Sequence, residues 1–65
     1  MLHDLVVMAA HRNATIRARA EEVLLPTFGT AALPAIAAAR EELASDRDAL
    51  ERLGELEARV RSSGR

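Results

Sequence analysis

The two histidines are the side chains best suited to metal binding or proton transfer. His3 and His11 are eight residues apart, so on a helix they lie about two turns from each other. Neither belongs to a His-x-x-x-His pair, and no carboxylate completes a set of ligands at zinc-site spacing. The pattern therefore predicts two surface imidazoles, with no metal ion and no other cofactor.

Paired carboxylates occur at Glu21-Glu22 and Glu41-Glu42. Adjacent positions on a helix point about 100° apart, so neither pair converges on a substrate for acid–base catalysis. The hydroxyl side chains have no histidine and aspartate at triad spacing, and Thr15, Thr30 and Ser45 suit helix caps better. We therefore expect no enzymatic activity and no small-molecule substrate.

The basic residues form one cluster, Arg12, Arg17 and Arg19, which two glutamates follow directly. The net charge is -1 and the isoelectric point about 6.1, whereas a nucleic-acid interface needs a clear basic excess. The longest apolar stretch, Leu5 to Ala10, is far shorter than the roughly 18 residues of a membrane span. We expect no nucleic acid and no membrane as partner, and the cytoplasm as the compartment.

The size of the chain limits how large a core it can bury. Its 65 residues make a single small helical domain, 1–65, and the hydrophobic fraction of 49% is rich in alanine, which adds helix propensity but little buried area. The chain has one aromatic residue and no cysteine, so disulfide staples are absent. A protein partner, or a second copy in a homo-oligomer, is therefore expected to complete the core.

Apolar side chains at helical spacing predict a first helix over Leu2–Arg12. Asn13 suits the cap of a second helix, and Thr15 could cap it instead. Pro26 lacks the N–H that would bond back to Glu22, so the second helix should end or kink there. Gly29 suits the left-handed position just past a helix end.

A third helix is expected to follow, with Thr30 as its cap and Pro34 in its first turn. Ser45-Asp46 is either the cap of a fourth helix or a polar patch within a continuous one. Asp48 and Arg52 lie four residues apart, as in a stabilising helical ion pair.

Ten apolar side chains on these helical stripes are expected to form the core and interface. They are Leu5, Val6, Ile16, Leu24, Leu33, Ile36, Leu43, Leu50, Leu53 and Val60.

The stretch from Asn13 to Ile36 carries a recognisable order: Ile16-Arg17, Ala20, Leu24, Gly29 and then Ala32-Leu33-Pro34-Ala35-Ile36. It resembles the HEAT repeat, whose second helix opens with Val-Arg-x-x-Ala and is followed by an Ala-Leu-Pro-x-Leu segment. The resemblance implies an all-α fold of short antiparallel helical hairpins, in a HEAT-like stack of three to four helices. It also implies a non-catalytic scaffolding or protein-binding module, such as a fragment or cap of a helical-repeat protein.

Two other readings stay open. A continuous helix from Ala32 to Arg61 would place apolar residues at six of eight a and d positions, as in a small dimeric coiled coil or helical bundle. A helix-turn-helix nucleic-acid binder with Ile16–Leu25 in the groove is less favoured, because the chain is acidic.

Overall fold

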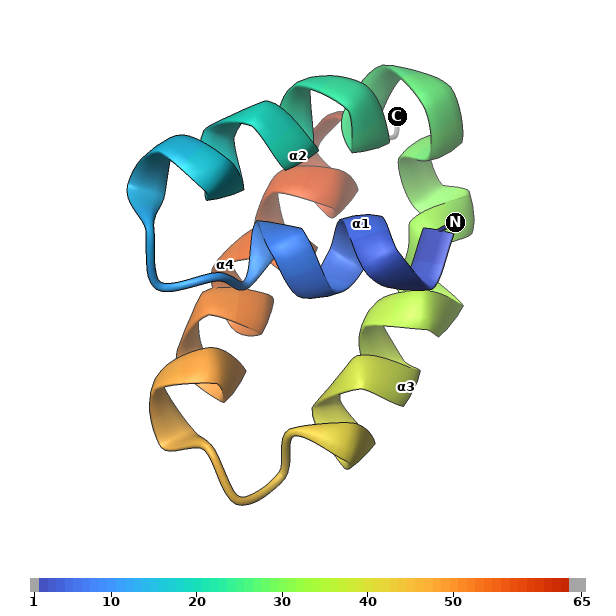
Figure 1. The fold of residues 1–65 in the computed structure, drawn as a ribbon. Helices are drawn as coiled ribbons and strands as arrows, with labels where there is room; N and C mark the ends of the chain where they lie inside the picture. The colour runs from blue at the N-terminus through green and yellow to red at the C-terminus, as the bar shows by residue number, and fades with distance from the viewer. Residues whose placement is uncertain (1, 64–65) are drawn as a thin grey trace.

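The computed structural model describes residues 2–63. Their elements, in chain order, are α1 (Leu2–Ala9), α2 (Ala14–Phe28), the 3-10 helix η1 (Gly29–Ala32), α3 (Leu33–Glu42) and α4 (Arg47–Ser63). Figure 1 shows α2 above α1 and α3 below it, while α4 runs behind α1 from the lower left towards the top. These residues contain no strand, which confirms the all-α prediction.

The first helix is shorter than its apolar pattern suggests. It ends at Ala9, and the chain turns through hydrogen bonds from the Ala10 and His11 amides to carbonyls three residues back, both 3.1 Å long. The Asn13 side chain then accepts the Thr15 amide at 2.9 Å. Of the two candidates, Asn13 and not Thr15 therefore caps α2, because its side chain supplies an acceptor that the first helical turn lacks.

Helix α2 does not end at Pro26 but two residues later, at Phe28. Gly29 follows with φ of +53° and ψ of −132°, so its φ is positive as predicted but its backbone is not in the left-handed helical conformation. Its amide donates to the Leu24 and Leu25 carbonyls. The predicted Thr30 cap is wrong, because η1 intervenes and α3 begins without a side-chain cap. Pro34 does lie in the first turn of α3, where its missing N–H costs no helical bond.

By length and composition, the helical run Ala14–Glu42 passes the test for a membrane-spanning segment. Its best window has a mean hydropathy of 1.4, and 22% of that window is buried. The core helix of a soluble protein passes the same test, so length and composition alone do not distinguish the two kinds of helix. Figure 1 also shows that α2 and α3 point in different directions on either side of Gly29, so the run is not one straight rod.

Replacing Gly29 and Gly54 by alanine should change the free energy of unfolding in opposite directions. Gly29→Ala should lower the free energy of unfolding by about 1–2 kcal/mol, because a Cβ is strained at φ of +53°. Gly54→Ala should raise it by up to about 1 kcal/mol through helix propensity. The added Cβ there would lie 3.5 Å from the Arg40 Nη2 atom, an ordinary contact with a flexible side chain. Urea unfolding of both variants measures the two signs, and a matching sign would contradict this account.

Asp46 settles the ambiguity at the fourth helix. Helix α3 ends at Glu42, and the Asp46 Oδ1 atom accepts the Ala49 amide at 3.1 Å, so Asp46 caps α4. The continuous helix from Ala32 to Arg61 is therefore absent, and with it the long stripe that a dimeric coiled coil requires.

The core runs through the centre of the molecule and holds no buried polar side chain among residues 2–63. Six of its twelve buried hydrophobic side chains are alanine, so the large apolar groups are few. The six larger ones come from all four α-helices: Val6, Leu24, Ile36, Leu53, Leu56 and Val60.

The ten expected packing residues fall into three groups. Val6, Leu24, Ile36, Leu53 and Val60 are buried. Leu5, Leu33 and Leu43 are partly exposed and pack against that core. Ile16 and Leu50 are half-buried outside it. Leu56 belongs to the buried core although it is not among the ten.

Ion pairs join helices whose sequence positions are far apart. The carboxylate of Glu57 on α4 forms ion pairs with Arg40 of α3 at 2.7 Å and with Arg61 of its own helix at 2.8 Å. The hydrogen bond from Arg61 is the main cause that lowers the pKa of Glu57, and the two positive charges act in the same direction against desolvation. Arg59 reaches Glu21 of α2 at 3.0 Å.

Candidate functional site

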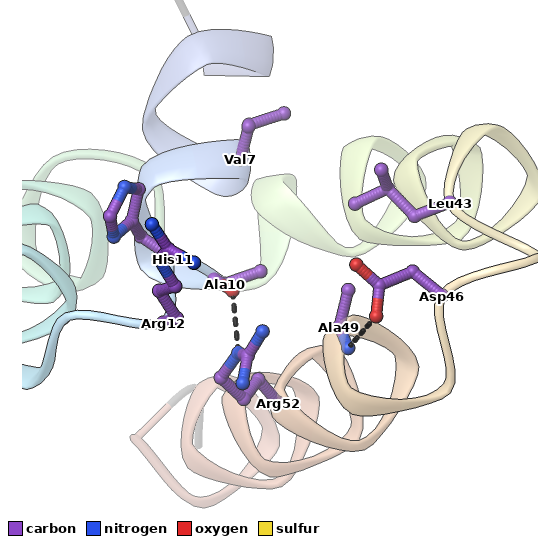
Figure 2. A pocket seen from close by; sticks show the side chains of 8 residues that line it. All are labelled: Val7, Ala10, His11, Arg12, Leu43, Asp46, Ala49 and Arg52. Carbon is purple, nitrogen blue, oxygen red and sulfur yellow. Dashed lines mark hydrogen bonds between the residues drawn. The ribbon is translucent and has the colours of Figure 1, made fainter.

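An open pocket of about 370 Å³ lies where the loop between α1 and α2, residues 10–13, approaches the loop between α3 and α4, residues 43–46 (Figure 2). We call it the loop pocket. Its lining comes from α1, both loops and the first turns of α4: Val7, Ala10, His11, Arg12, Leu43, Asp46, Ala49 and Arg52.

Four apolar residues form walls of the loop pocket, namely Val7, Ala10, Leu43 and Ala49. Ala10 and Ala49 are each only 4% exposed, and Val7 is 38% exposed at the surface. The small alanine side chains leave room between the end of α1 and the start of α4. The hollow therefore has the size and the lining to take an aliphatic side chain.

Arginines fix the loop that forms one side of this pocket. The Arg52 Nε atom donates to the Ala10 carbonyl at 2.7 Å, as Figure 2 shows. Arg17 Nη1 donates to the carbonyls of His11 at 2.8 Å and Arg12 at 2.9 Å. Three successive carbonyls past the end of α1 thus accept bonds from two guanidinium groups. Carbonyls at a helix C-terminus lack helical partners and carry partial negative charge, so arginine suits them.

The remaining polar groups of the loop pocket are engaged in local bonds. His11 Nδ1 accepts the Asn13 amide at 2.9 Å, which assigns the ring proton of the neutral imidazole to Nε2. Asp46 Oδ1 caps α4. Figure 2 shows His11 and Asp46 on opposite sides of the pocket, so they do not form an acid–base pair. What the arrangement offers is an apolar hollow with charged groups at its edge.

Little of this site was foreseeable. Among the ten expected packing residues, only Leu43 lines the loop pocket. His11 was expected at the surface, and it is exposed at the pocket's edge. The pocket positions of Ala10 and Ala49 were not predicted, because an alanine that leaves space has the same sequence signature as an alanine that fills it. The position of Arg52 was not predicted either, because its bond partner lies 42 residues away.

No protein-family model matches the chain, and neither a curated protein nor a solved structure is similar enough to be matched to it.

Proposed function

We propose that this chain is a non-catalytic protein–protein interaction module that receives a side chain of its partner in the loop pocket. The observation that carries the proposal is the pocket itself, with its apolar walls and its edge of two arginines and an aspartate. Interfaces commonly pair such an apolar centre with a polar rim.

The surface next to the pocket supports the proposal. Val7 on α1 is 38% exposed at the surface and also forms part of the pocket wall. Apolar side chains that gather around a hollow are typical of a docking site. The alanine-rich core adds a reason for docking, because burial of further apolar area would stabilise a small chain.

The HEAT-like arrangement is part of the proposal. Two helix–loop–helix units, α1–α2 and α3–α4, follow each other along the chain, and both of their internal loops border the loop pocket. A module built in this way would act as a scaffold that displays its loops to a protein partner in the cytoplasm.

Photo-crosslinking from the pocket tests the function. A photoreactive amino acid at Val7, introduced into the whole chain in the cell that produces it, should crosslink to a polypeptide that mass spectrometry identifies. The same group at Glu51, which is exposed on α4, serves as the matched control and should give no such product. We expect the Val7 product to disappear when Leu43→Glu adds charge to the pocket wall.

Crosslinks from Val7 only to nucleic acid or small molecules, or equal yields from Val7 and Glu51, would overturn the proposal.

Melting curves provide a second check, because zinc or duplex DNA at moderate salt should leave the melting temperature unchanged. Stabilisation by one equivalent of zinc, or DNA affinity that falls steeply with salt, would favour a metal or nucleic-acid site instead.

A further inference from the structure

We infer that the occupant of the loop pocket is the outer face of α2 from a second copy of this chain, with Val23 as the inserted side chain. The inference rests on the proposed function, because it names the partner of the same pocket.

Val23 is the most exposed large hydrophobic side chain of residues 2–63, at 50%. The next residue, Leu24, is fully buried and faces the core. Val23 lies about 100° around the helix from it and points outward. Exposed Arg19 and Glu22 precede Val23 by four and one residues. Arg19 lies four residues before Val23 and three before Glu22, so it shares a helix face with each of them, whereas Glu22 lies about 100° around the helix from Val23. The outer surface of α2 thus presents an aliphatic group and one charge of each sign.

The loop pocket offers the complementary set. Its apolar walls match Val23, whereas Arg12 and Arg52 at its edge match Glu22. Asp46 lies on the other side of the pocket from these arginines (Figure 2) and matches Arg19. Within residues 2–63, neither Arg19 nor Glu22 makes an ion pair inside the chain, so both charges are available to a partner. Paired charges of this kind set the register of an interface more than its affinity.

Each copy carries both the pocket and the inserted face. Two copies therefore either engage each other reciprocally in a closed dimer or join head to tail in a longer series. In both arrangements the association buries Val23, which is 50% exposed in the single chain.

A charge swap on the purified whole chain tests the inference. Analytical ultracentrifugation over a wide dilution series should show a multiple of the monomer mass that dissociates on dilution.

Arg12→Glu and Glu22→Arg should each weaken the association about tenfold, and the double variant Arg12→Glu/Glu22→Arg should recover most of the lost affinity. Val23→Ser should also weaken association about tenfold, whereas Glu41→Arg, an exposed charge reversal on α3, should leave it unchanged. Circular dichroism confirms that each variant is folded.

A monomer mass at every concentration would overturn the inference. It would also be overturned if the chain associates but the double variant fails to recover affinity, or if Val23→Ser and Glu41→Arg behave alike. These failures are distinct from failure of the proposed function. A monomeric chain whose Val7 photoprobe captures a different polypeptide would retain the interaction module and exclude only self-association.

Discussion

Leu53→Asp should unfold the chain at neutral pH. Leu53 is fully buried at the centre of α4's apolar face, so an aspartate there would lose packing and place an unpaired charge in the core. The combined cost is about 4 kcal/mol or more. A domain of 65 residues has roughly 3–10 kcal/mol of stability in all. Loss of the helical circular dichroism signal, or a large drop in the urea midpoint, measures the effect.

Glu51→Ala is the matched control for this prediction. Glu51 lies on the same helix two residues away and is exposed, so its change should move the free energy of unfolding by no more than about 0.5 kcal/mol. Equal effects of the two substitutions would show that α4 turns a different face to the core.

Arg52→Met should produce the second largest effect, a loss of about 1.5–3 kcal/mol of unfolding free energy. Methionine keeps the apolar stem of the side chain but removes the donor that meets the Ala10 carbonyl at 2.7 Å. The carbonyl would then lose a charged partner in a partly buried position. Urea unfolding with an unchanged slope is the measurement that reports stability alone.

Arg47→Met offers the comparison for Arg52→Met. Arg47 begins the same helix and is exposed, and within residues 2–63 it forms none of the ion pairs. Its replacement should cost less than about 0.5 kcal/mol. Similar losses at the two positions would mean that general charge, rather than the bond to the Ala10 carbonyl, explains the role of Arg52.

Local chemistry made part of this fold predictable. Asn13 caps α2, and Gly29 takes a positive φ, because each role depends on one side chain and its nearest neighbours. Asp46 was ambiguous because a cap and a polar surface residue look identical until the helices pack. The Thr30 cap failed for a related reason, since α2 passes into η1 without the extended residue that a cap requires.

The loop pocket was not predictable, because tertiary packing assembles it. Ala10 follows the first helix and Ala49 lies in the last one. Nothing in the local sequence around either residue indicates that the two lie close together. Arg52 illustrates the same limit. Its spacing suggested an ion pair with Asp48, but the closer partner in the fold is the Ala10 carbonyl, 42 residues away. A long-range backbone acceptor leaves no trace in a pattern of side chains.

The shortness of α1 makes the first helix depend on its packing. Eight residues are too few for a helix to persist alone in water, so α1 is stable only when it is docked on the other helices. The bond from Arg52 to the Ala10 carbonyl, just past the end of α1, helps to hold it there across 42 residues of sequence. Because Val7 of this helix and Ala10 after it form part of the pocket wall, whatever fills the loop pocket also holds the first helix in place and stabilises the fold.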